Sequence, residues 1–355
     1  MQDNAFALSR RRALFASGLT ACASMLPAAA HASHHFESAA SRSNPRIALT
    51  DFYVFKAEEG NRTVFLLDVN FAPKAGEDLL DRAAAYNIHC ATGDDLKAGF
   101  TWTFAYDGAQ LACHQLGEAN GALGAKGRKL GPVTEGKATE LPGGIRAWVG
   151  RAKDPFFGNS PALGAFRAQL AQGKYDPKVW EKASGKNIFL GRTCGVLVLE
   201  VPNTLLGRQI SAFTTVAVNE AGKWRQVQYM AKCLMAHVML FEDEALKAAF
   251  DASRPDTQSQ FVNFFSARIA RSAHFAKSRS DPFAYGDETA GRLLPDVLPY
   301  EVGSDAAYTP ERFNGRKLSD DAMSTTLSLL IGQPVDQHLE DLRNYTSKFP
   351  YVIPV

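Results

Sequence analysis

Two histidines and a glutamate near the start of the chain have the clearest capacity for metal chemistry, because they lie together between Ser33 and Glu37. If the chain is cleaved directly before Ser33, the new terminal amine, two backbone amides and the imidazole of His35 form a square-planar site for Cu(II) or Ni(II). The alternative is that His34 and Glu37 only anchor this segment by hydrogen bonds, with His35 exposed to solvent. We predict His34, His35, Glu37 and Asp51 as metal ligands, with copper as one expected ion.

A second set of candidates consists of aspartates that stand beside turns or strand ends. They are Asp51, Asp154, Asp296, Asp320 and Asp321. Hard carboxylate oxygens suit Ca²⁺, so calcium is the second ion we expect. However, the chain has no Asp-x-Asp-x-Asp-Gly loop, and aspartates next to proline, glycine or asparagine commonly cap helices and close turns. The sequence leaves both roles open.

Arg151 and Arg316 lie close in sequence to these carboxylates, just before Asp154 and Asp320. A guanidinium binds a carboxylate through two parallel hydrogen bonds, and such pairs would fix the neighbouring loops. The same geometry recognises a carboxylate or phosphate on a ligand. Ion pairing within the chain and ligand binding are therefore the two predicted roles of Arg151 and Arg316.

Asp68 and Glu200 each interrupt an apolar run that is typical of a strand. Burial there would raise the pKa of either carboxyl group. A position facing solvent at a sheet edge is the more common arrangement, and it is the one we predict for both.

Four cysteines lie beyond residue 32, namely Cys90, Cys113, Cys194 and Cys233. An even number in an oxidising compartment favours disulfides. We predict the pairs Cys90–Cys113 and Cys194–Cys233, since each pair falls on strands expected to be neighbours. Four cysteines allow other connectivities, and a metal or redox site is the alternative, although no C-x-x-C spacing supports it.

The usual signatures of catalysis are missing from the sequence. It has no Gly-x-Ser-x-Gly elbow, no glycine-rich phosphate loop and no His-Glu-x-x-His zinc helix. Cys233 and His237 would meet on a helix, but their segment is more typical of a strand, which argues against a thiol–imidazole nucleophile. The common hydrolase, nucleotide-binding and metalloprotease chemistries therefore lack their residues, and whether the protein is an enzyme stays open.

The first 32 residues have the pattern of an export signal. A run of arginines, Ser9-Arg10-Arg11-Arg12-Ala13-Leu14-Phe15, precedes an apolar stretch that ends at Ala30-His31-Ala32. The paired arginines followed by Leu14-Phe15 are typical of twin-arginine signals, which export folded proteins. We predict a periplasmic protein cleaved after Ala32. Lipidation of Cys22, within Leu19-Thr20-Ala21-Cys22, is the alternative.

Charge and hydropathy exclude two classes of partner for the chain beyond Ala32. The formal net charge of +2 falls to zero when the leader, with its three arginines and one aspartate, is removed. A neutral domain lacks the basic footprint that nucleic acids require. No later segment offers the apolar run of about 18 residues that a transmembrane helix needs.

Alternating apolar residues predict strands over most of the remaining chain. Residues 50–55 and 63–69 form an expected hairpin, and Phe100, Trp102, Phe104 and Tyr106 place four aromatic rings on one strand face. Further strands are expected at 196–201, 210–218 and 224–241. We interpret residues 115–143 as a long loop and residues 161–180 as loosely helical.

In the last third of the chain, the spacing of apolar residues becomes typical of helices. Apolar residues recur three and four apart in 242–252, 257–274 and 319–331, with Asp256 and Ser319 as expected N-caps. The sequence thus predicts an α+β fold rich in strands, with antiparallel sheets arranged as a sandwich or barrel and helices in the C-terminal third. Residues 33–355 form one large domain or two packed halves.

Several fragments, in order along the chain, carry a family resemblance. They are Ser33-His34-His35-Phe36-Glu37, Thr50-Asp51-Phe52-Tyr53-Val54-Phe55, Gly150-Arg151 with Asp154-Pro155-Phe156-Phe157, Gly185 with Asn187, Leu199-Glu200-Val201-Pro202, Leu294-Pro295-Asp296-Val297-Leu298, Phe313-Asn314-Gly315-Arg316 with Asp320-Asp321, and Phe349-Pro350-Tyr351. With them the chain resembles the exported bacterial proteins grouped as domain of unknown function 4331. The resemblance implies an exported, β-rich domain and supplies no activity.

Three functions remain open at this point. The first is a periplasmic binding or structural domain without catalysis, which holds a metal ion and an unidentified ligand or protein partner. The second is a metal-dependent periplasmic enzyme, such as an oxidoreductase. The third is an interaction protein anchored through a lipid on Cys22.

Overall fold

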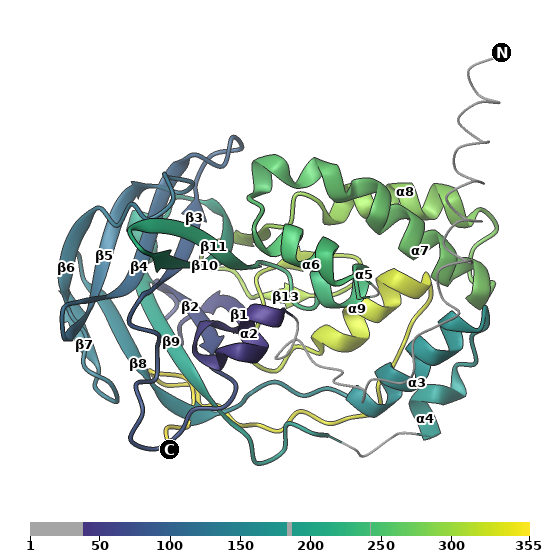
Figure 1. The fold of residues 1–355 in the computed structure, drawn as a ribbon, viewed down its shortest axis with the longest axis horizontal. Coiled ribbons are helices and arrows are strands. Elements are labelled where there is room, and N and C mark those ends of the chain that lie inside the picture. The colour runs from purple at the N-terminus through teal and green to yellow at the C-terminus, as the bar shows by residue number, and fades with distance from the viewer. Residues whose placement is uncertain (1–37, 183–186, 242) are drawn as a thin grey trace.

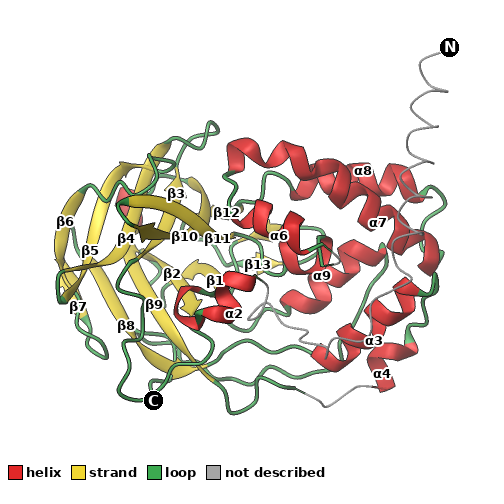
Figure 2. Cartoon of the chain, viewed as in Figure 1, coloured by secondary structure: helices red, strands yellow, loops and turns green. Residues whose placement is uncertain are grey.

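The computed structural model describes residues 38–182, 187–241 and 243–355. The expected leader, Cys22 and the predicted ligands His34, His35 and Glu37 lie outside the described residues. Figure 2 shows that strands gather at one end of the molecule and most helices at the other. The prediction of a strand-rich α+β fold with antiparallel sheets and helices toward the C-terminus is confirmed.

The first sheet has five antiparallel strands, and it carries the candidate site. Its order is β1 (Leu49–Lys56), β2 (Arg62–Val69), β9 (Thr193–Pro202), β8 (Ile145–Lys153) and β7 (Thr139–Leu141). The β1–β2 hairpin is the one that the apolar runs predicted. Nearly all residues of β1, β2 and β9 are buried, so both faces of this sheet are covered.

The second sheet packs against one face of the first. Its strands are, in order, β11 (Lys223–Met230), β10 (Gln209–Glu220), β3 (Ala84–Ala91), β4 (Ala98–Asp107), β5 (Gln110–Glu118) and β6 (Arg128–Pro132), and β12 (Leu298–Glu301) also pairs with β10. The ring of Phe65 on β2 lies 5.6 Å from that of Trp102 on β4. Trp102 and Phe104 are buried as the aromatic alternation predicts, so this face forms the core between the sheets.

The helices cover the remaining parts of the molecule. They are α2 (Ala39–Ser43), α3 (Ser160–Ala171), α4 (Lys178–Lys182), α5 (Met235–Met239), α6 (Glu244–Asp251), α7 (Val262–Ala276), α8 (Pro282–Leu293) and α9 (Ala322–Ile331), with short 3₁₀ turns at Pro45–Ile47, Asn203–Leu205 and Pro255–Phe261. A two-stranded ribbon joins β13 (Ala307–Tyr308) to β14 (Phe313–Asn314). Helix α9 is buried at every residue except Ser324. None of the described helices is long and apolar enough to cross a lipid bilayer.

The C-terminal segment returns to the first sheet near β8 (Figure 1), and its contact with Phe55 lies on the face opposite the second sheet. Residue Pro354 forms a bridge with Ala152 of β8, and the ring of Tyr351 lies 5.4 Å from that of Phe55 on β1. Arg316 exchanges two backbone hydrogen bonds with Val54 of β1. The last forty residues therefore help to bury this face, from which the candidate ligands project.

Four local expectations are wrong, and one helix was missed. Residues 115–143 are not a loop, because they complete β5 and contain β6 and β7; β6 is an edge strand with exposed charged residues, which hides the alternation. Residues 224–241 contain β11 and then α5, and helix α8 was not expected. Asp321, and not Ser319, caps α9, and Arg254, and not Asp256, precedes the 3₁₀ turn at Pro255.

Candidate metal centre

Three buried side chains converge on the covered face of the first sheet. Asp68, Asp154 and Cys194 each offer one ligand atom, and these three atoms lie within 4.8 Å of one another. Asp68 and Cys194 are 0% exposed and Asp154 is 1% exposed. Two carboxylate oxygens and one sulfur thus share a small volume in the interior.

The strand pairing explains why residues so distant in sequence meet. Asp51 on β1 stands directly opposite Asp68 on β2, and Cys194 on β9 stands opposite Ala152 on β8. Side chains two residues apart on an extended strand share a face, so Asp154 extends from the same face as Ala152. Four neighbouring chain segments therefore place their polar side chains together at one end of the sheet.

A β-bulge sets the position of Asp51. The pairing of β1 with β2 passes from Leu49 opposite Val69 to Asp51 opposite Asp68, so that Thr50 is an extra residue. A regular ladder would place Thr50 opposite Asp68. A bulge re-aims the side chains that follow it, and here it turns Asp51 toward the cluster.

The negative charge of Asp68 is poorly compensated by its surroundings. Burial raises its pKa well above the ordinary value, and the negative charges of Asp154 and Asp51 raise it further, whereas Arg316 lowers it. Neither carboxylate oxygen of Asp68 has a hydrogen-bond partner among the described residues. An unsatisfied buried carboxyl group is costly, so Asp68 is a candidate ligand for a cation.

Arg316 is the buried cation beside the cluster. Its Nη1 donates to Oδ1 of Asp51 at 2.6 Å, and its guanidinium carbon lies 4.1 Å from the centre of the Tyr53 ring. The thiol of Cys233 also donates to Oδ1 of Asp51, at 3.2 Å. Oδ2 of Asp51 accepts no hydrogen bond from the described residues, so one oxygen of this carboxylate still faces the interior unsatisfied.

A glycine next to Arg316 permits this arrangement. Gly315 has φ of +70°, and a Cβ atom there would lie 2.3 Å from the carbonyl oxygen of Val54. Any other residue would push this segment away from β1. Gly315 therefore allows the close approach that places Arg316 over Asp51.

Glu200 is a buried carboxylate of the same sheet whose charge is neutralised by arginines. Arg146 donates to it from two nitrogens at 2.9 and 2.7 Å, Arg62 lies 3.3 Å away, and the Tyr351 hydroxyl also donates to it. Glu200 thus has two arginines to itself. The contrast with Asp68 makes the acidic cluster distinct from an ordinary buried ion pair.

Burial also affects the sulfur of the cluster. It raises the pKa of Cys194 well above the ordinary value, and the charges of Asp68, Asp154 and Asp51 act in the same direction. The thiol is therefore protonated in the absence of a cation. A bound metal ion reverses this preference because it stabilises the thiolate that coordinates it.

The expected disulfides are not formed in the described residues, where all four cysteines are buried thiols. Cys90 and Cys113 lie on β3 and β5, and β4 separates these strands, so they are not the neighbours that the prediction assumed. Two strand spacings amount to about 9.6 Å, beyond the separation that a disulfide spans. Cys194 belongs to the acidic cluster, and Cys233 donates to Asp51.

The remaining predicted site residues are dispersed. Arg151 pairs with Glu135 and donates to the carbonyls of Lys74 and Glu77, so its expected pair with Asp154 is wrong. Arg316 pairs with Asp51, although Asp320 and Asp321 were the expected partners.

Three of the predicted aspartates have structural contacts of their own. Asp296 lies 3.5 Å from buried Lys232, Asp320 accepts from the backbone of Lys317, and Asp321 caps α9. The contacts of Asp320 and Asp321 fit the turn and capping role that the sequence left open, whereas Asp296 belongs to a buried ion pair.

Two members of the cluster were not identified as ligands from the sequence. Asp68 was expected to face solvent, but β2 is an inner strand covered on both sides. A charged residue inside an otherwise apolar run was the available signal for Asp68. The second member, Cys194, was interpreted only as a disulfide partner. Glu200, which lies outside the cluster, was also wrongly expected to face solvent and is 0% exposed.

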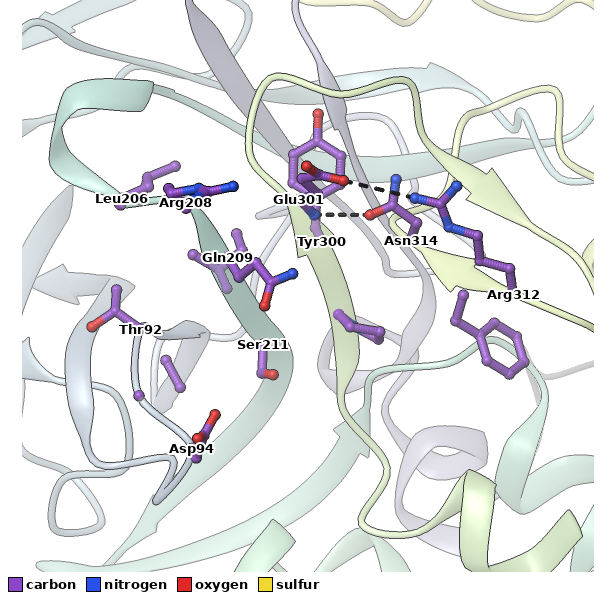
Figure 3. A pocket seen from close by; sticks show the side chains of 16 residues that line it. Thr92, Asp94, Leu206, Arg208, Gln209, Ser211, Tyr300, Glu301, Arg312 and Asn314 are labelled. Atoms are coloured by element: carbon purple, nitrogen blue, oxygen red, sulfur yellow. Dashed lines mark hydrogen bonds and ion pairs between the residues drawn. The ribbon is translucent and has the colours of Figure 1, made fainter. Parts of the chain in front are cut away.

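A surface groove provides a separate cavity of about 720 Å³. Figure 3 shows Arg208, Gln209 and Ser211 on one side and Glu301 and Arg312 on the other, with Glu301 and Arg312 paired at 3.8 Å. The members of the acidic cluster do not line this groove. The groove is polar and open, so it is a place where a ligand could bind without reaching the cluster.

Comparisons of the chain with protein-family models, with curated proteins and with solved structures found no match.

Proposed function

We propose that this protein is an exported binding or structural domain that holds one divalent metal ion in its interior, at Asp68, Asp154 and Cys194. The observation that carries the proposal is the pair of oxygens on buried Asp68 that have no partner among the described residues, beside two further ligand atoms within 4.8 Å. A cation at this point would satisfy the carboxylates and offset their mutual repulsion.

The burial of the site favours a structural role for the ion over a catalytic one. All three ligand residues are at most 1% exposed, and the large surface groove lies elsewhere. A catalytic metal keeps a position that substrate can reach from solvent, and neither of two surface pockets of the described residues borders these three side chains. This supports the binding or structural domain over the metal-dependent oxidoreductase.

Export to the periplasm is part of the same proposal, and its support is the arginine-rich leader. A twin-arginine route would deliver the domain folded, with its interior already closed. Mass spectrometry of the mature N-terminus tests this part: a chain beginning at Ser33 supports cleavage after Ala32, whereas a lipid on Cys22 would support the anchored alternative. Copper binding by His34, His35 and Glu37 remains a second, separate prediction.

The metal site is tested by Asp68→Asn, which removes a charge while keeping the shape of the side chain. We expect wild-type protein to melt at a higher temperature with its ion than after chelation and refolding, because a ligand that binds only the folded state stabilises it. Asp68→Asn should lose this difference. Its metal-free form should also be at least as stable as metal-free wild type, since the variant removes an uncompensated buried charge.

Glu220→Gln is the matched control, because Glu220 is an exposed carboxylate paired with Arg225. It should keep the full metal-dependent increase in melting temperature. If chelation leaves wild-type stability unchanged, or if Asp68→Asn responds to metal as wild type does, the proposed function is wrong.

A further inference from the structure

The chemical class of the ion follows from the types of its three ligands. Ca²⁺ and Mg²⁺ take six or more oxygen ligands, and neither accepts a sulfur ligand in ordinary protein sites. Zn²⁺ combines carboxylate oxygen at about 2.0–2.2 Å with thiolate sulfur at about 2.3 Å in a site of four ligands. The presence of Cys194 between Asp68 and Asp154 therefore favours a zinc-class ion and argues against the calcium that the aspartates alone suggested.

The packing around the cluster determines how an ion could reach it. The backbone N–H of Phe156 donates to Oδ1 of Asp154, and its ring lies 5.9 Å from the guanidinium of Arg316. Phe156 packs edge-on against the ring of Phe189 at 4.7 Å, and both rings are buried. Tyr308, also buried, lies 5.8 Å from the same guanidinium. Aromatic side chains thus border the cluster and its arginine.

Neither of two surface pockets of the described residues is lined by Asp68, Asp154, Cys194 or Arg316. A hydrated divalent ion is larger than any gap in a packed core, because protein interiors are as dense as organic crystals. Entry or exit would require these aromatic side chains or the sheet to separate.

We infer that the site takes a zinc-class ion while the chain folds and then retains it, without exchange, for as long as the domain stays folded. This inference rests on the proposed function and adds the identity of the ion and the moment of its uptake. If the leader directs folded export, uptake takes place in the cytoplasm. The cytoplasmic supply of metal, and not that of the periplasm, then selects the ion.

Exchange of the bound ion tests the inference on the intact mature protein. Protein isolated with its native metal is incubated with a large excess of Cd²⁺, and native mass spectrometry follows the replacement of one ion by the other. We expect replacement on the timescale of global unfolding, about hours to days for a stable domain. One cycle of unfolding and refolding in Cd²⁺ should instead give complete replacement.

Two core variants distinguish a local opening from global unfolding. Phe156→Ala removes a ring beside the cluster, whereas Phe166→Ala removes an equally buried ring from α3, where it packs on Trp180. We expect Phe156→Ala to increase the rate of Cd²⁺ entry by more than it increases the rate of global unfolding. Phe166→Ala should speed entry only in proportion to its faster unfolding.

The outcomes separate this inference from the function on which it rests. Replacement within minutes in wild-type protein would overturn retention, and calcium in the site would overturn the assigned ion class, while either result would leave a metal-holding domain in place. Absence of any bound ion, together with stability that does not respond to metal, would overturn both.

Discussion

At the scale of single residues, the feature that matters is the imbalance of charge around Asp68. Two other carboxylates, Asp51 and Asp154, raise its pKa, and Arg316 is the cation among the described residues that lowers it. A buried charge is tolerated only when it is paired and hydrogen-bonded. Arg316 is therefore central to the stability of the metal-free fold, and the ion that we propose would supply the compensation that is missing.

Replacement of Arg316 should be severe. Arg316→Met leaves Asp51 buried without its ion pair, and we expect a loss of about 3–5 kcal/mol in the free energy of unfolding, measured with denaturant. Asp51→Asn in the same chain should recover part of this loss. Arg225→Met, at an exposed pair with Glu220, should cost less than about 1 kcal/mol. Equal losses for the two arginine variants would contradict the account.

At the scale of elements, the first sheet brings the ligands together through strand order and register. Asp51 and Asp154 were candidates from the sequence because they stand next to turn-forming residues. Asp68 and Cys194 could not be assigned as candidate ligands, since the cluster joins β2 to the end of β8 across about eighty residues, and β8 to β9 across about forty. Strands buried on both faces also lack the alternation that would show which way a side chain points.

Strand order also predicts the state of the cysteines. Because β4 lies between Cys90 and Cys113, and Cys194 faces the acidic cluster, we expect four reactive thiols per mature chain after unfolding without reductant. A thiol-reactive chromophore measures this number. If only two thiols react, and digestion yields two peptides joined by a Cys194–Cys233 disulfide, the pairing predicted from the sequence would be supported. Cys194 would then no longer be a candidate ligand.

The loop before β6 is tied to the β4–β5 hairpin by an acid-sensitive contact. Lys126, Lys129 and His114 lower the pKa of Asp107 from 3.8 to about 2. A carboxylate with a lowered pKa stabilises the fold above its ordinary pKa, and this contribution is lost as the pH falls from about 4 to 2. Asp107→Asn should therefore be less stable than wild type at pH 6, with the difference shrinking below pH 4.

Urea unfolding at a series of pH values measures this difference. Asp94→Asn is the control, because Asp94 is exposed and forms no ion pair with the described residues. Its stability relative to wild type should not follow the same acid profile. A difference for Asp107→Asn that stays constant from pH 6 to pH 2 would show that the contact does not act through charge.

At the scale of the whole molecule, the sequence predicted the class of fold and most of its strands. The aromatic alternation of β4 and the β1–β2 hairpin were clear because one or both faces pack in the core. Helix α8 was missed because its buried side includes Gly286, Thr289 and Ala290, which give little apolar periodicity. The polar edge strand β6 was missed for a similar reason.

The enclosed position of the cluster links the fold to the proposed route of export. The first sheet is covered on one face by the second sheet and on the other by the C-terminal third of the chain. The site is complete only when these distant parts have folded together. A protein exported in the folded state would therefore arrive with its ion already enclosed.

The most direct test is a crystal of the mature protein, measured at X-ray wavelengths on both sides of the zinc absorption edge. We expect one anomalous peak from an ion bound by carboxylate oxygens of Asp68 and Asp154 at about 2.0–2.2 Å and by the sulfur of Cys194 at about 2.3 Å. A cluster without anomalous density, in protein never exposed to chelators, would contradict it. So would a metal bound only at the N-terminal histidines.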